Sequence, residues 1–170
     1  MLPSSLHSMN FAVCELGELT LYLRFTVMAY EELQNRFGSI AKAYEAVTSL
    51  NVSDLIAVLE ILSRNGELSR RYLGYTETKI YTKEELLVAL QPSDIPGIRD
   101  AVTSALIDGT SESKEETVDL GLLRLNKEKK QDLTVIYKAA LQLGMSMKEI
   151  MLMPLGDIYD ILTAGEKDGN

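Results

Sequence analysis

The chain has 170 residues and a formal net charge of −8, which argues against a nucleic-acid partner, because binding to a phosphate backbone depends on Lys and Arg. Its single cysteine excludes an internal disulfide bond and is typical of proteins from a reducing compartment. A hydrophobic fraction of 46% with only 6% aromatic residues permits one core of aliphatic side chains, which favours packed helices.

The beginning of the chain gives no sign of membrane targeting. Residues 1–10 lack the basic and long apolar segments of a signal peptide and are expected to form a leader. No uninterrupted apolar run approaches the ~20 residues that cross a bilayer. We therefore expect a soluble protein of the cytoplasm with no membrane partner.

A β-hairpin is predicted at residues 11–25. Between residues 19 and 25, Leu and Phe alternate with polar residues and Tyr, which is the period-2 pattern of a half-buried strand. Residues 11–15 form the preceding strand, and Gly17 supplies the turn. Because two strands alone are marginal in water, the hairpin is expected to pack on helices or to pair with another subunit.

Three helices are predicted after the hairpin, each preceded by a residue whose side chain can accept from a backbone amide. Thr26, Ser39 and Ser53 are the expected N-caps. The first helix ends at residue 37 and the second near residue 47. The third is expected over residues 54–65, with Gly66 ending it.

Two more helices complete the first domain, residues 11–109. Thr82 and Glu85 form a capping box that opens a helix over residues 83–90. Another helix begins at Ser93, carries Pro96 in its first turn and reaches residue 108. The predicted fold class is therefore mostly α with a small N-terminal β-hairpin (α+β).

The end of the chain is predicted to form a short helical extension. Residues 110–127 begin with a polar, acidic stretch and are expected to be a linker. Residues 128–165 form the extension, and residues 166–170 form a tail.

The extension is predicted to contain a helix whose apolar face includes Leu141 and which Gly144 ends, followed by a short helix with a Ser146–Glu149 capping box. Pro154 is expected to start a final helix.

Chemistry-bearing patterns are lacking in the sequence. The one histidine, His7, falls in the leader, so a Ser–His–Asp or Cys–His arrangement is not expected. Cys14 falls in a strand, where a small buried hydrophobe is the default interpretation. No motif for phosphate, zinc or calcium binding occurs. We expect no catalytic, cofactor-binding or metal-binding residues and predict that the protein is not an enzyme.

Four of the seven methionines fall within nine residues near the end of the chain. Met is flexible and polarizable, so such a cluster suits either gap-filling in a core or an adaptable partner surface. The candidate partner-binding residues are Leu133, Ile136, Tyr137, Met145, Met147, Met151, Met153, Leu155, Ile158 and Tyr159.

The order of elements resembles tail assembly chaperones of long-tailed bacteriophages and prophages. Four phrases carry the resemblance: RFTVMAYEELQNRFGSI, VSDLIAVLEILSRNGE, TKEELLVALQPSDIPGIRDAVTSALIDG and LTVIYKAALQLGMSMKEIMLMPLGDIYDIL. The resemblance implies a protein that binds and solubilises the tape-measure protein and recruits tail-tube subunits through its C-terminal extension. It further implies action in the bacterial host cytoplasm and absence from the mature virion.

Other interpretations remain open at this point. The chain fits a tail-completion or connector protein that is retained in the particle, and it fits a host-type helical adaptor. Self-association into a homo-oligomer, through the hairpin edge or exposed helical faces, accompanies the chaperone hypothesis.

Overall fold

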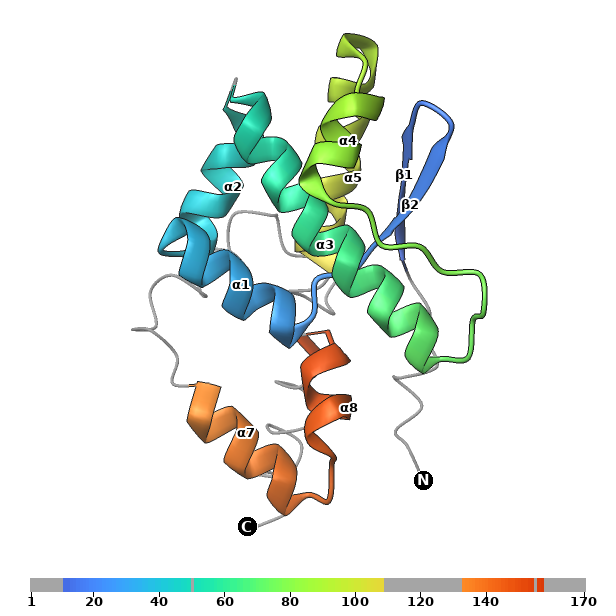
Figure 1. Ribbon diagram of the computed structural model, residues 1–170. Coiled ribbons are helices and arrows are strands. Elements are labelled where there is room, and N and C mark those ends of the chain that lie inside the picture. Colours follow the sequence, from blue (N-terminus) through green and yellow to red (C-terminus); the bar gives the residue numbers. More distant parts are fainter. Residues whose placement is uncertain (1–10, 50, 109–132, 155, 158–170) are drawn as a thin grey trace.

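The computed structural model describes residues 11–49, 51–108, 133–154, 156 and 157, with only the backbone described for residues 133–136. These residues form a two-stranded sheet and a set of helices, which confirms the α+β prediction (Figure 1). The elements are β1 (Ala12–Leu16), β2 (Leu19–Leu23), α1 (Val27–Phe37), α2 (Ile40–Thr48), α3 (Val52–Tyr72), α4 (Lys83–Ala89), a 3-10 turn (Pro92–Asp94), α5 (Ile95–Asp108), α7 (Leu133–Gln142) and α8 (Met147–Leu152).

The hairpin has the predicted turn and the predicted buried face. β1 and β2 are antiparallel, with Cys14 opposite Leu21, and Gly17 adopts a φ of 58° at the turn. Cys14, Leu21 and Leu23 are buried, and the sheet packs on α3 and α5. Two strands are therefore stable here because helices cover one of their faces.

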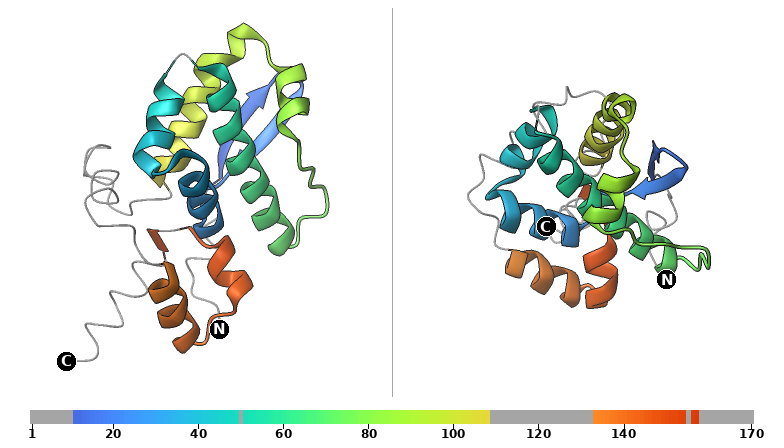
Figure 2. Two further views of the ribbon diagram at one scale, coloured as in Figure 1. Left: turned by 60° about the vertical axis from the view of Figure 1, so that its left-hand side comes forward. Right: turned by 45° about the horizontal axis from the view of Figure 1, so that its top comes forward.

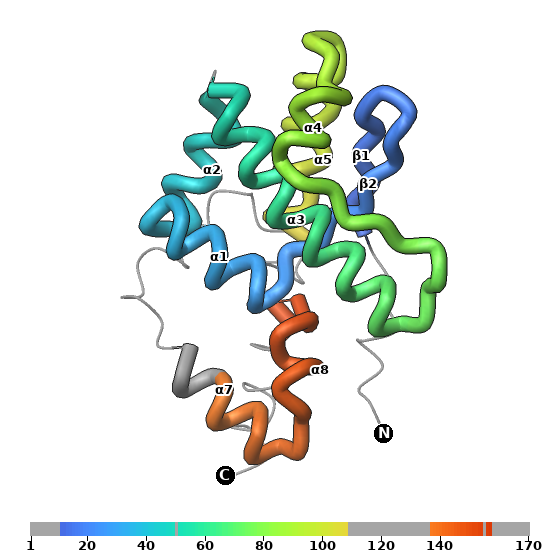
Figure 3. The backbone as a smooth tube through the Cα atoms, viewed as in Figure 1, coloured from blue at the N-terminus to red at the C-terminus, as the bar shows by residue number. Residues whose placement is uncertain are grey.

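Helix α3 is the central element, and it continues well beyond its predicted end at Gly66. It runs to Tyr72 because the glycine serves packing: a Cβ on Gly66 would lie 1.8 Å from the carbonyl oxygen of Tyr22 in β2. The predicted N-cap was also wrong, since Asn51 rather than Ser53 accepts from the amide of Asp54. Figure 3 shows α3 passing between the hairpin and α1.

Most predicted caps are confirmed. Thr26 and Ser39 cap α1 and α2, and the Thr82–Glu85 capping box opens α4. Pro96 lies in the first turn of α5, although the preceding residues from Pro92 form a separate 3-10 turn. These caps were predictable because each depends on residues within one helical turn.

The helices α7 and α8 lie together at one end of the molecule, beside the N-terminal end of α1 (Figure 2). Gly144 (φ 87°) separates them, and the Ser146–Glu149 capping box is confirmed. The core includes Ile150 of α8, so this helix packs on the first domain. The predicted linker, residues 110–127, lies outside the described residues, as does the predicted final helix apart from Gly156 and Asp157, which are helical.

Candidate functional site

The C-terminal segment is attached to the first domain through the backbone. The amide of Val27, at the start of α1, donates to the carbonyl of Met153 at 3.0 Å, and Thr26 and Pro154 form an isolated antiparallel bridge. The first amides of a helix have no partner within the helix, so Met153 supplies an acceptor that α1 itself cannot provide. Met153, from the C-terminal segment, thus supplies a hydrogen-bond acceptor to the N-terminus of α1.

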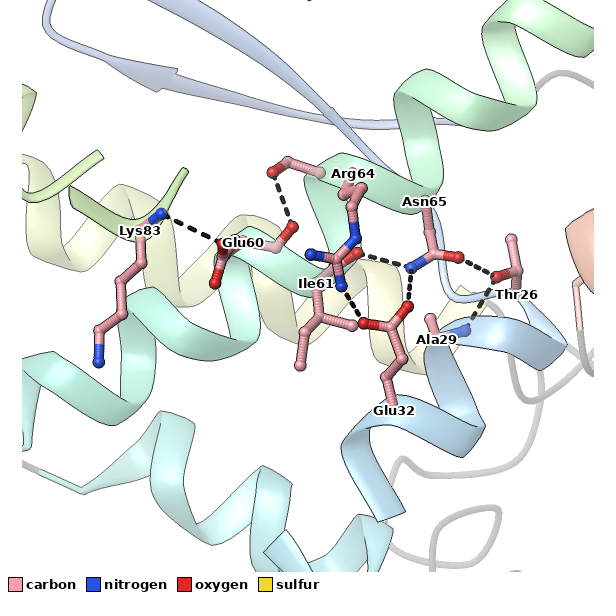
Figure 4. Close-up of polar contacts among 9 residues, drawn as sticks. Thr26, Ala29, Glu32, Glu60, Ile61, Arg64, Asn65 and Lys83 are labelled. Atoms are coloured by element: carbon pink, nitrogen blue, oxygen red, sulfur yellow. Dashed lines mark hydrogen bonds and ion pairs between the residues drawn. The ribbon is translucent and has the colours of Figure 1, made fainter. Parts of the chain in front are cut away.

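A buried polar network fixes the helix that receives this contact (Figure 4). The Thr26 hydroxyl accepts from the amide of Ala29 at 3.1 Å and donates to Asn65 Oδ1 at 2.8 Å. The Asn65 amide nitrogen donates to the carbonyl of Ile61 and to Glu32, which also pairs with Arg64. Because the buried members of this network have partners, it makes the α1–α3 junction rigid.

Two tyrosines link the C-terminal helices to the first domain. The Tyr137 hydroxyl donates to Glu31 at 3.3 Å, and the Tyr72 hydroxyl donates to Glu149 at 3.4 Å. Burial, followed by the negative charge and hydrogen bond of Glu31, raises the pKa of Tyr137 to about 12. The neutral phenol is therefore the form that the folded protein favours.

We expect stability to fall at high pH partly through Tyr137. An ordinary tyrosine titrates at about pH 10, so below that pH the Tyr137 phenol is neutral in both the folded and the unfolded chain. Its contribution to the free energy of unfolding is therefore at its full value there. It is lost as the pH rises towards about 12, the folded pKa. Urea unfolding across this window should show a shallower decline for Tyr137→Phe than for the wild type. Equal slopes for the two proteins would contradict this linkage, since the other tyrosines are common to both.

The four clustered methionines divide between core and surface. Met153 is fully buried, and Met145 and Met151 are partly buried against the core. Met147 remains 47% exposed. Three of the four therefore fill space beside the first domain, and one faces solvent.

Of the candidate residues other than the methionines, only Tyr137 has its side chain within the described part of the chain. Tyr137 is half-buried and bonded to Glu31. The side chains of Leu133 and Ile136 lie outside the described residues, as do Leu155, Ile158 and Tyr159. Whether these residues meet a partner stays a prediction.

An exposed apolar corner joins α7 to α8, and we define it by Leu141, Leu143 and Met147. Their exposed fractions are 45%, 54% and 47%. The sequence placed Ala140 and Leu141 on one apolar face of their helix; in the structure Ala140 is buried and Leu141 lies at the exposed margin of that face. Leu143 was missed, since it lies where the helix ends at Gly144 and helical spacing no longer indicates direction.

Beside this corner lies an open groove of about 370 Å³, which we call the cationic groove. Its lining comes from α1, α3 and α8: Met28, Leu68, Arg71, Tyr72, Lys148, Met151 and Leu152. Both charged residues of the lining are cations, and Lys148 Nζ lies 5.2 Å from the centre of the Tyr72 ring. Sequence reasoning found only Met151, because the other walls come from helices that are far apart in the chain.

Cys14 is the only cysteine in the sequence. Cys14 is 2% exposed, and burial raises the pKa of its thiol to about 11, so the reactive thiolate is disfavoured. Within the described ranges, no group of three or more His, Cys, Asp or Glu side chains is placed to hold a metal ion. None of the helices in the described part of the chain is long and apolar enough to cross a membrane.

Comparison with protein-family models, with curated proteins and with solved structures found no match to this chain. The described residues form a helical scaffold with an exposed apolar corner and an adjacent groove.

Proposed function

We propose that this protein is a non-enzymatic tail assembly chaperone, which binds and solubilises the tape-measure protein and recruits tail-tube subunits. The observation that carries the proposal is the apolar corner formed by Leu141, Leu143 and Met147, which is held in place by the packing of α8 on α1 and α3. The order of hairpin and helices, from which the resemblance was drawn, supports it.

A long helix with exposed apolar stripes is unfavourable in water. A long helical client with apolar stripes aggregates unless those stripes are covered, and a small apolar surface covers them through contacts at i, i+3, i+4 and i+7. The net charge of −8 favours solubility of the covered client. A chaperone is released from its client once assembly is complete, so we place this protein in the host cytoplasm and outside the mature virion.

Co-expression with a tape-measure protein, the client that the proposal names, tests the proposal. We expect the wild-type chain to raise the soluble fraction of that client several-fold, and Leu143→Asp to abolish the increase. Val88→Asp is the matched control, because it places the same charge at an exposed residue of α4, far from the corner. Thermal unfolding of both variants checks that they remain folded.

Equal insolubility of the client with and without the wild-type chain would overturn the proposal. Abundant peptides from this chain in purified mature particles would instead indicate a retained connector.

A further inference from the structure

The two long walls of the cationic groove repeat one pattern of residues. Each wall contributes a cation and two apolar or aromatic side chains at the spacing that places them on one helical face. On α3 these are Leu68, Arg71 and Tyr72, and on α8 they are Lys148, Met151 and Leu152. The Lys148 ammonium group lies 5.2 Å from the centre of the Tyr72 ring, so both cations lie where α3 ends and α8 begins.

The two cations of the groove form no ion pair within the described part of the chain. The Nε atom of Arg71 donates to Thr78 Oγ1 at 2.7 Å, which orients the guanidinium group without bringing a negative charge to it. Glu149, the carboxylate that follows the lysine in the sequence, accepts instead from the amide of Ser146 and the hydroxyl of Tyr72. Two positive charges are therefore available to an anionic group in the groove.

The groove continues into the apolar corner along α8. Met147 of the corner and Met151 of the groove are four residues apart, so they are neighbours on the helix surface. A client helix that covers the corner therefore reaches the groove with its next turn. The groove measures about 370 Å³, near the lower limit of ligand pockets (~300–1,000 Å³), so it accommodates a few client side chains rather than a whole helix.

We propose that the cationic groove selects client helices that carry a carboxylate one turn away from their apolar residues. The client's apolar side chains then contact the corner, Met28 and Met151, and its carboxylate lies between Arg71 and Lys148. An Asp or Glu beside an apolar stripe matches the groove in both polarity and charge. The inference rests on the proposed function, because it names the chemistry of the helix that the same surface receives.

The overall charge of the protein predicts the opposite preference. A net charge of −8 by itself attracts basic clients and repels acidic ones. In the groove, however, two cations act at contact distance, whereas salt screens the more distant charges of the surface. The sign of the preference therefore distinguishes selection by the groove from the general field of the protein.

Binding of three designed peptides to the full chain tests the inference. Each peptide is a helix with leucines at i, i+3, i+4 and i+7, and the three differ only in carrying Glu, Gln or Lys one turn beyond the last leucine. By fluorescence anisotropy at low salt, we expect the Glu peptide to bind about fivefold or more tightly than the Lys peptide, with the Gln peptide between them. Added salt should reduce this preference, because the groove is open to solvent.

A charge reversal in the groove gives the sharpest result. Lys148→Glu should remove or reverse the preference for the Glu peptide, because the added carboxylate opposes that of the peptide. Lys79→Glu is the matched control: Lys79 also lies over a tyrosine, 4.6 Å from the centre of the Tyr81 ring, but it lines a different hollow between β2 and α4. Both substitutions change the net charge equally, so Lys79→Glu should keep the wild-type preference. Circular dichroism checks that both variants remain folded.

Equal or tighter binding of the Lys peptide by the wild type would overturn the inference, and so would failure of the Glu peptide to bind. A folded Lys148→Glu variant with the wild-type preference, or a Lys79→Glu variant without it, would show that the groove is not the source of selection. These failures are distinct from failure of the proposed function. A tape-measure protein that is solubilised while the peptides show no charge preference would overturn the selection by the groove and leave the chaperone proposal standing.

Discussion

Replacing Gly66 with alanine is expected to destabilise the fold by at least about 3 kcal/mol, because the added Cβ has no room. It would lie 1.8 Å from the carbonyl oxygen of Tyr22 and 2.7 Å from its carbonyl carbon. Both atoms belong to the backbone of β2, so a change of side-chain rotamer cannot relieve the clash. The gain of about 1 kcal/mol in helix propensity is too small to offset this cost.

Gly97→Ala is the matched control for this experiment. Gly97 lies in the first turn of α5 with no atom within 4 Å of a built Cβ, so its replacement should be neutral or stabilise by up to about 1 kcal/mol. Urea unfolding monitored by circular dichroism compares the two variants with the wild type. Equal stability of Gly66→Ala and the wild type would show that the hairpin does not pack closely on α3.

Replacing Met153 with alanine is expected to lower the free energy of unfolding by about 2 kcal/mol or more. Met153 is fully buried beside α1, and the cavity left by its truncation would weaken the attachment of the C-terminal helices. Because α8 shares the core of the first domain, the loss should appear in a single unfolding transition.

Met147→Ala serves as the control for this second experiment. Met147 is 47% exposed, so its truncation should change the stability by no more than about 0.5 kcal/mol. An unchanged unfolding curve for Met153→Ala, or an early transition confined to the C-terminal helices, would contradict the shared core.

The fold was largely predictable because its local signals agree with one another. Alternating residues predicted the hairpin, and Thr26, Ser39 and the two capping boxes predicted helix starts correctly. The third helix shows the limit of such reasoning. Gly66 has the residue type of a helix end, but here it is required by the close approach of β2, a contact with residues more than forty positions away.

The candidate site was predictable only in part. The sequence drew attention to the methionine cluster, yet it offered no means of telling buried Met153 from exposed Met147. It gave no sign that Met28, Arg71 and Lys148 would line one groove, because these residues come from three different helices.

The fold class, most helix starts and the acidic character of the protein follow from the amino-acid sequence alone, because they depend on composition and on interactions within one helical turn. The contact of the Met153 carbonyl with the start of α1 and the meeting of Met28, Arg71 and Lys148 in one groove became visible only in the folded chain. The reason is physical: burial and the distribution of charge over a surface are set by which distant segments pack together, and no local pattern encodes that packing.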